Sequence, residues 1–253
     1  MTEDRGQTGS SVRHVSAERW RQAQEWELGL WKDGQRKRGW KRVAWPLMAP
    51  ALRALKWSRA WGDDWNHWWK ERFDGYRFLP TRLGDCIELG CGPYTNIRLI
   101  LEGREAGRVV CSDPLARSYV TFRGRWLASA NASGLVEIDD HPIEETPFPP
   151  SSFDLVVMIN VLDHVRDADA CMRKAVELVS PGGYFVIGQD LCDDQDLARH
   201  PYDVGHPIRL SKEDLEPYLA PLSTVHRKDL SRDEGRDPRL HCATLVYTGR
   251  KPR

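Results

Sequence analysis

The sequence lacks a net charge, a long apolar run and paired cysteine motifs. Thirty-seven Lys and Arg balance 37 Asp and Glu over 253 residues, so no overall field attracts the chain to nucleic acid. The longest apolar run, residues 45–52, is short and broken by prolines, and the N-terminus does not resemble a signal peptide. The six cysteines form no Cys-x-x-Cys pair, which favours reduced thiols. We therefore expect a cytoplasmic protein with no nucleic-acid partner and no membrane span; its expected assembly is a homodimer.

Tryptophan, by contrast, is abundant and unevenly distributed. Ten of the eleven tryptophans lie between Trp20 and Trp69. Helical spacing of apolar residues predicts one helix over residues 16–32, capped by Ser16, and another over 63–78, capped by Asp63. Because so short and aromatic a region has too little core to fold alone, residues 1–80 are expected to form a helical extension that packs on a second domain, residues 81–253. The aromatic side chains either pack there or form a lid that faces an acceptor.

After residue 80 the pattern changes to short apolar runs that alternate with amphipathic stretches. Strands are predicted at residues 85–89, 108–112, 135–138, 153–159 and 184–188. Helices are predicted at residues 96–102, 115–130 and 168–179. This alternation predicts an α/β domain with a parallel sheet covered on both faces. Two later strands, 223–228 and 241–248, are joined by the loop 229–240 and indicate a C-terminal antiparallel hairpin.

The first predicted strand ends in a glycine turn directly before a helix. Gly90 and Gly92 allow the backbone to approach a ligand closely, beside the exposed N–H groups of the helix start. The second strand ends in Asp113, whose carboxylate can accept both hydroxyls of a ribose. A Gly-x-Gly turn alone is weak support for nucleoside binding. Here the segment 143–149 and the turn 180–183 follow in order, each before an apolar strand.

These four motifs, in this order and at this spacing, make residues 83–188 resemble the class I S-adenosylmethionine-dependent methyltransferases. The resemblance implies a Rossmann-like fold with a seven-stranded, mostly parallel sheet, and S-adenosylmethionine as cofactor. The resemblance implies that Glu88, Gly90 and Gly92 contact the methionine end of the cofactor and that Asp113 binds its ribose. Pro114 and Leu115 would flank the adenine, and Ile143 and Glu144 would lie at the edge of the adenine. Ile159 and Asn160 would lie beside the sulfonium. Two departures from the family pattern are the missing third glycine in the run 93–96, and Pro142 in place of an acid.

The same motifs have a rival interpretation as a nicotinamide-dependent dehydrogenase. That fingerprint requires Gly-x-Gly-x-x-Gly, and Thr95 occupies the third glycine position. An acid before the first glycine, Glu88, also suits the amine of methionine better than a pyrophosphate. The methyltransferase is therefore the preferred interpretation, and a non-catalytic nucleoside-binding partner protein stays open as a third.

Methyl transfer to a hydroxyl requires an oriented acceptor and a base that removes its proton. Histidine is the usual base near neutral pH. His164, just after the fourth predicted strand, is the first candidate, and His206, after the fifth, is the second. Asp163 is a third candidate for the catalytic set. The alternative for each histidine is a loop residue with local hydrogen bonds only.

Residues 160–164 also resemble a degenerate Glu-x-x-Glu-His element, which binds a divalent cation in ubiquinone-pathway O-methyltransferases and small-RNA ribose methyltransferases. The resemblance implies a cation such as magnesium at Asp163 and His164. Asn160 replaces the first glutamate and removes a charge from that site. The acids at positions 190, 193, 194 and 196 are either further ligands or part of a solvated loop.

The acceptor is inferred from the tryptophans. The run Trp65-Asn66-His67-Trp68-Trp69 resembles the N-terminal region of bacterial polysaccharide O-methyltransferases. An aromatic wall beside polar groups suits the hydroxyl of a sugar or oligosaccharide, and polysaccharide biosynthesis is the predicted role. The alternative acceptor is a small natural product such as a phenol, polyketide or isoprenoid.

Overall fold

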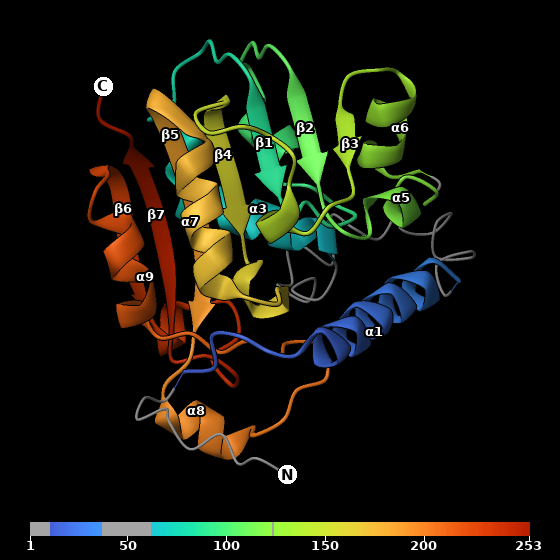
Figure 1. Cartoon of the computed structure of the whole chain (residues 1–253), viewed down its shortest axis with the longest axis vertical. Coiled ribbons are helices and arrows are strands. Elements are labelled where there is room, and N and C mark those ends of the chain that lie inside the picture. The colour runs from blue at the N-terminus through green and yellow to red at the C-terminus, as the bar shows by residue number, and fades with distance from the viewer. Residues whose placement is uncertain (1–10, 37–61, 123) are drawn as a thin grey trace, which may run out of the picture.

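A seven-stranded sheet forms the centre of the molecule. The computed structural model describes residues 11–36, 62–122 and 124–253, and its sheet has the order β3-β2-β1-β4-β5-β7-β6 (Figure 1). The strands are β1 (Cys86–Leu89), β2 (Val109–Ser112), β3 (Glu137–Asp139), β4 (Phe153–Ile159), β5 (Val179–Leu191), β6 (Ser223–Ser231) and β7 (Ala243–Arg250). β1 to β5 are parallel, and β7 is antiparallel to both β5 and β6. The predicted α/β fold and C-terminal hairpin are confirmed.

Continuous burial explains why the central strands could be found from the sequence. Every residue of β1 and β2 is buried, as in a sheet covered on both faces. The longest strand, β5, differs from its prediction because it begins at Val179 and contains the expected turn at residues 180–183. Phe153 pairs with Val179 and Leu155 with Tyr184, so the intervening residues form an irregularity with Gly182 at φ 80°.

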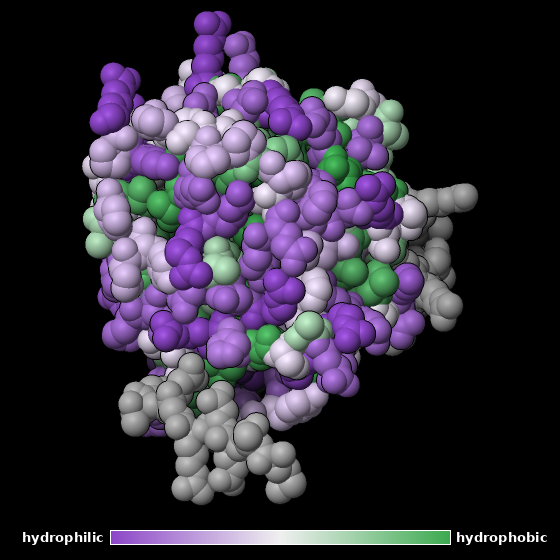
Figure 2. All heavy atoms as spheres, in the orientation of Figure 1, coloured by the Kyte–Doolittle hydropathy of each residue, from purple (hydrophilic) through white to green (hydrophobic). Residues whose placement is uncertain are grey.

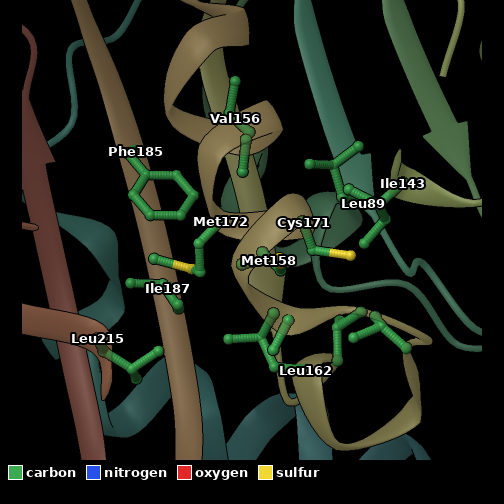
Figure 3. Packing of buried hydrophobic residues seen from close by; sticks show 14 of the residues in the cluster. Leu89, Ile143, Val156, Met158, Leu162, Cys171, Met172, Phe185, Ile187 and Leu215 are labelled. Carbon is green, nitrogen blue, oxygen red and sulfur yellow. The ribbon is translucent and has the colours of Figure 1, made fainter. Parts of the chain in front are cut away.

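Helices cover the two faces of the sheet. One face carries α7 (Ala168–Leu178) and α9 (Lys212–Leu219), whose apolar residues share a core cluster with β4 and β5. Figure 3 shows Cys171 and Met172 of α7 among the side chains of Met158 and Phe185. The other face carries α3 (Gly62–Arg72), α4 (Ile97–Ile100), α5 (Ala116–Tyr119) and α6 (Trp126–Ala132). Two helices lie near the carboxyl ends of the parallel strands, α1 (Ala17–Arg36) and α8 (Asp194–Arg199) (Figure 1).

Several helix predictions were wrong in extent. The single helix expected over 115–130 is two helices, because Gly124 at φ 72° interrupts it. The helix expected over 63–78 ends at Arg72 and is followed by a 3₁₀ turn, Asp74–Tyr76, with Gly75 at φ 68°. It begins at Gly62, so Asp63 lies in its first turn and not before it. Ser16 does cap α1, since its Oγ accepts from the Arg19 amide at 3.2 Å.

Two helices, α8 and α9, were missed. Of the four acids considered as further ligands or as a solvated loop, Asp190 lies in β5, and the other three begin α8, where Asp193 and Asp196 form a capping box. Ser211 and Asp214 form the same motif at the start of α9. Both helices are short, six and eight residues, so their apolar periodicity covers too few turns to be recognised.

The aromatic helix α3 is part of the main core. Trp69, Phe73 and Tyr76 are fully buried and belong to the cluster that contains β1 and β4 residues. A Cβ at Gly188 of β5 would come within 2.6 Å of the Trp69 ring, so this glycine makes room for the tryptophan. These residues of the expected N-terminal extension therefore pack in the same hydrophobic core as the sheet.

The face that carries α7 is mainly hydrophilic, with small and separate apolar patches (Figure 2). Within the described parts of the chain, no helix has the length and apolar character needed to cross a membrane.

Candidate active site

A cavity lies at the carboxyl ends of β1, β2 and β4, beneath α1, which crosses that edge of the sheet (Figure 1). This is where ligands bind in open α/β sheets. The predicted site residues that line it are Gly90, Gly92, Asp113, Pro114, Ile143, Glu144, Ile159, Asn160 and His164. Four predicted residues, Glu88, Leu115, Asp163 and His206, are not part of this lining.

The two glycines of the turn have different surroundings. Both adopt positive φ, 65° at Gly90 and 56° at Gly92, which disfavours other residues. A Cβ at Gly90 would come within 2.3 Å of a Val161 methyl group, so this position must be small for packing. A Cβ at Gly92 would meet no atom within 4 Å. Gly92 thus leaves its backbone open to the cavity.

Glu88 is not part of the cavity lining and supports the glycine turn from behind. Its fully buried carboxylate accepts from the Asn96 amide at 2.8 Å, from the Asn96 side chain at 3.0 Å and from the Ile97 amide at 3.0 Å. Burial raises the pKa of Glu88 to about 7, against these hydrogen bonds. Glu88 therefore holds the start of α4 under the glycine turn.

Asp113 connects the ends of β1 and β2. Its Oδ2 accepts from the Gly92 amide at 3.1 Å and its Oδ1 from the Leu115 amide at 2.8 Å. Burial, followed by the charge of Glu27, raises the pKa of Asp113 to about 7. Leu115, which the sequence assigned to the adenine, thus contributes its amide to this carboxylate. A buried acid beside an open glycine backbone is suited to bind hydroxyl groups of a ligand.

The predicted adenine-edge and sulfonium residues are held by hydrogen bonds to neighbouring backbone groups. Ile143 and Glu144 lie in a 3₁₀ turn, and Glu144 Oε1 accepts from the Asp167 amide at 3.0 Å. Asn160, at the end of β4, adopts φ 55° and donates its amide to the Gly188 carbonyl at 2.6 Å. Its Oδ1 accepts from the Asp190 amide at 3.4 Å. These bonds bring the ends of β4 and β5 together at the cavity.

His164 lines the cavity from the 3₁₀ turn Leu162–His164. Its Nδ1 is buried, has no hydrogen-bond partner among the described residues and lies 3.6 Å from Glu27 Oε2. Its Nε2 lies 3.7 Å from Asp163 Oδ2. Two carboxylates, those of Glu27 and Asp163, therefore flank one imidazole.

His206 lies behind His164, with ring centroids 4.6 Å apart. Its Nδ1 is hydrogen-bonded to Asp203 Oδ2 at 2.9 Å, and its Nε2 lies 4.0 Å from Asp163 Oδ2. Although burial opposes it, the Asp203 bond and the charge of Asp163 raise the pKa of His206. Burial likewise opposes the ionised form of Asp163, yet the charges of His164 and His206 lower its pKa. His206 and Asp163 thus form the polar layer under His164.

This layer has the donor set of a metal site. One atom from each of Asp163, His164 and His206 lies within 4.8 Å of the others. Carboxylates beside the second nitrogen of each histidine are typical of metal-bound imidazoles; Asp203 and Glu27 occupy those positions here. The residues therefore fit a divalent cation that prefers mixed nitrogen and oxygen ligands. The predicted pair Asp163 and His164 is extended by His206.

Helix α1 closes the cavity over His164. Trp20 Nε1 and Gln24 Nε2 donate to the His164 carbonyl at 3.1 and 3.3 Å. Arg19 donates to the carbonyls of Asp203 and Val204. These contacts place Glu27, which accepts from Tyr119 Oη at 2.9 Å, on the cavity wall. The sequence did not single out Glu27; its helical spacing from Trp20 and Trp31 was the available signal.

Helix α3 and the β6–β7 hairpin supply the rest of the wall. Asn66 donates to the Tyr94 and Thr95 carbonyls at 2.9 and 2.6 Å, and so fixes the segment after the glycine turn. Trp65 and Arg236 also line the cavity, with the guanidinium carbon 4.3 Å from the indole centroid. Arg236 lies in the predicted loop 229–240, which gave no signal of function.

The comparisons with known proteins all find similarity to methyltransferases. Residues 87–187 match a family described as a methyltransferase domain. The chain shares 32% identity with a ubiquinone biosynthesis O-methyltransferase of Methylobacterium sp. (strain 4-46), over 47% of this chain and 56% of that protein. It shares 26% identity with the 27-O-demethylrifamycin SV methyltransferase of Amycolatopsis mediterranei (strain S699), over 45% of this chain and 41% of that protein.

Among solved structures, N-methyltransferase NodS of Bradyrhizobium japonicum WM9, in complex with S-adenosyl-L-homocysteine, has the same fold. The TM-score is 0.56 at 19% identity, covering 80% of this chain and 98% of that chain. The chain spans about half the length of the curated relatives it matches.

Proposed function

We propose that the protein is an S-adenosylmethionine-dependent O-methyltransferase that methylates a hydroxyl of a sugar or oligosaccharide, in polysaccharide biosynthesis. The observation that carries the proposal is that one cavity combines an open glycine backbone and a buried carboxylate with a histidine and an aromatic side chain. At one end, Gly92 leaves its backbone open and Asp113 presents a buried carboxylate. Elsewhere on the wall, His164 lies under α1, and Trp65 contributes a partly exposed indole. The residues at the first end fit the nucleoside and methionine parts of the cofactor.

The chemistry assigns a separate role to each wall. When bound, S-adenosylmethionine supplies an electrophilic methyl group on a positively charged sulfur. Asp113 binds the ribose hydroxyls, and the turn at Gly90 and Gly92 contacts the methionine end. His164 takes the proton of the acceptor hydroxyl as the hydroxyl oxygen forms the new bond to the methyl carbon. The carbon–sulfur bond breaks in the same step, and the electron pair leaves with the sulfur as S-adenosylhomocysteine. Asp163, 3.7 Å from Nε2, stabilises the resulting imidazolium.

A divalent cation is the second way to activate the hydroxyl. Asp163, His164 and His206 would hold it, and a bound cation would lower the pKa of a coordinated hydroxyl. The two arrangements differ in metal dependence. Activity that survives a chelator assigns His164 to the base role, whereas activity that is lost and restored by magnesium or manganese assigns these residues to the cation.

A small natural product is the alternative acceptor. The two curated relatives are O-methyltransferases named for ubiquinone biosynthesis and for a rifamycin derivative. An aromatic wall suits the face of a planar ring as well as that of a sugar.

The test is an assay with methyl-labelled S-adenosylmethionine against a panel of glycans, sugars, phenols and polyketides, read by mass spectrometry. We expect S-adenosylhomocysteine to bind in calorimetry and one acceptor class to gain the mass of one labelled methyl group in place of a hydrogen atom. Cofactor binding without transfer to any acceptor would favour a non-catalytic nucleoside-binding protein. Absence of cofactor binding would overturn the proposal.

A further inference from the structure

The segment after the glycine turn contains a strained residue. Residues 93–96 include no glycine, yet Thr95 adopts φ 42°, a left-handed conformation that disfavours β-branched side chains. The threonine side chain does not hold this conformation, because its Oγ1 is buried and has no hydrogen-bond partner among the described residues. A residue in such a conformation persists only where its surroundings keep it there. Since Thr95 also lines the cavity, its conformation affects the shape of the site.

Asn66 of α3 holds the carbonyl groups of this segment. Its Nδ2 donates to the Thr95 carbonyl at 2.6 Å and to the Tyr94 carbonyl at 2.9 Å. Both partners are acceptors, so the side-chain amide uses both of its N–H groups here. The Tyr94 carbonyl also accepts from Arg98 Nε at 3.1 Å. The Thr95 carbonyl therefore depends more on Asn66 than the Tyr94 carbonyl does.

The amide groups of the segment have other partners. The Thr95 amide donates to the Cys91 carbonyl at 3.2 Å. The Asn96 amide donates to the buried carboxylate of Glu88 at 2.8 Å. The turn and β1 thus support the amides of the segment, and α3 supports its carbonyls.

Asn66 is itself fixed by the core. Its exposure is 7%, and it lies one helical turn before Trp69, which is fully buried. The Trp69 ring fills the space that Gly188 leaves on β5. Because α3 is anchored in this way, the Asn66 amide is presented to the turn at a fixed position.

We propose that Asn66 is a positioning residue for the cofactor, because it holds Thr95 in a conformation that a glycine would adopt unaided. The proposal rests on the proposed function, in which S-adenosylmethionine is the ligand of this turn. Without Asn66, Thr95 should return to negative φ and displace the backbone of residues 93–96, which line the cavity. Glycine adopts positive φ at little cost, so Asn66 should become dispensable when position 95 is glycine.

The test is a double-mutant cycle on the full chain, with S-adenosylhomocysteine as the probe and calorimetry as the measurement. Asn66→Ala should weaken binding by about tenfold, through loss of two hydrogen bonds and release of the strained residue. Thr95→Gly alone should bind within about twofold of the parent, because Asn66 already holds the segment. In the double variant, the loss caused by Asn66→Ala should fall to about threefold or less.

His67→Ala is the matched control. His67 is the next residue of α3, is exposed, and is not one of the cavity-lining residues in the described ranges. This variant should leave the affinity unchanged with and without Thr95→Gly. Urea denaturation of every variant separates an effect on the turn from an effect on the whole fold.

Each outcome decides. A loss of affinity in Asn66→Ala that Thr95→Gly restores supports the proposal. Unchanged affinity in Asn66→Ala, or a loss of the same size with and without Thr95→Gly, overturns it and leaves the proposed function intact. If Asn66→Ala does not fold, a double variant that folds and binds supports the proposal, and one that also fails to fold overturns it. A parent protein that does not bind S-adenosylhomocysteine overturns the proposed function itself and the inference with it.

Discussion

The two ends of the cavity are built in different ways. The end that we propose for the cofactor comes from one short stretch, in which Glu88, the glycine turn and Asp113 follow each other within 26 positions. The end that we propose for the acceptor is assembled from α1, α3, the turn after β4 and the β6–β7 hairpin. The first end consists mainly of backbone held by buried carboxylates, and the second of side chains. We expect variants at the first end to affect stability and cofactor affinity, and variants at the second to affect turnover.

The largest effect is expected at the acceptor end. His164→Ala removes the proposed base, and loss of a general base typically lowers the rate by about 10²–10⁴-fold. The variant should still bind S-adenosylhomocysteine with an affinity within about twofold of the parent, because Asp113 and the turn are unchanged. Kinetics with the true acceptor and calorimetry measure the two quantities. His206→Ala is the comparison, with a smaller expected loss; near-parental turnover in both would move the base to a carboxylate such as Asp163.

The next effect is expected in stability at the cofactor end. Glu88→Ala leaves two backbone amides and the Asn96 side chain without their acceptor in a buried site. A buried donor without a partner costs about 1–3 kcal/mol, so a loss of about 3 kcal/mol in the free energy of unfolding is expected. Urea denaturation measures it. Glu88→Gln keeps one acceptor oxygen and should lose less; equal losses would mean that the charge, and not the hydrogen bonds, stabilises the turn.

Cofactor affinity should depend on pH through Asp113. The pKa of this acid is about 7 in the free protein, and its ionised form is the better acceptor for ribose hydroxyls. Affinity for S-adenosylhomocysteine should therefore rise as pH increases to about 7, approaching tenfold per unit, and level off above it. Asp113→Asn should bind about tenfold more weakly and lose this slope. Calorimetry between pH 5.5 and 8.5 tests both; an unchanged slope in the variant would assign it to Glu88.

The smallest effect is expected at the contact between α1 and His164. Trp20→Phe keeps an aromatic ring and removes the donor to the His164 carbonyl. One such hydrogen bond contributes about 0.5–1.5 kcal/mol, so a loss of turnover of a few-fold with unchanged cofactor affinity is expected. Gln24→Ala, which removes the second donor to the same carbonyl, should act similarly. Weaker cofactor binding in either variant would mean that α1 completes the cofactor end as well.

The sheet was predictable because burial on both faces leaves a simple pattern. β4 was found with the bounds that the structure has, since nearly all of Phe153–Ile159 is buried and apolar. The predicted helix bounds were less accurate where a single glycine with positive φ interrupts or follows a helix, as at Gly124 and Gly75. Those glycines act through φ, which hydrophobic periodicity does not report.

The cofactor end was predictable for a similar reason. The residues predicted to bind the cofactor belong to motifs with a regular spacing in the sequence, and eight of these ten residues line the cavity. Glu88 and Leu115 are the two that do not, because the carboxylate of Glu88 bonds to the start of α4 and the side chain of Leu115 packs against the hydrophobic core. Direction of a side chain within a correctly located motif depends on its packing partners.

By itself, the sequence determined the strand–helix alternation, the glycine turn and the acid after the second strand, because these depend on contacts between near neighbours in the chain. Only the tertiary structure decided that Glu27 and Trp20 would cover His164, that His206 would lie behind it, and that Arg236 would reach the cavity from the C-terminal hairpin. These residues come from segments up to about 200 positions apart. No periodicity connects them, and the folded sheet with α1 across its edge brings them together.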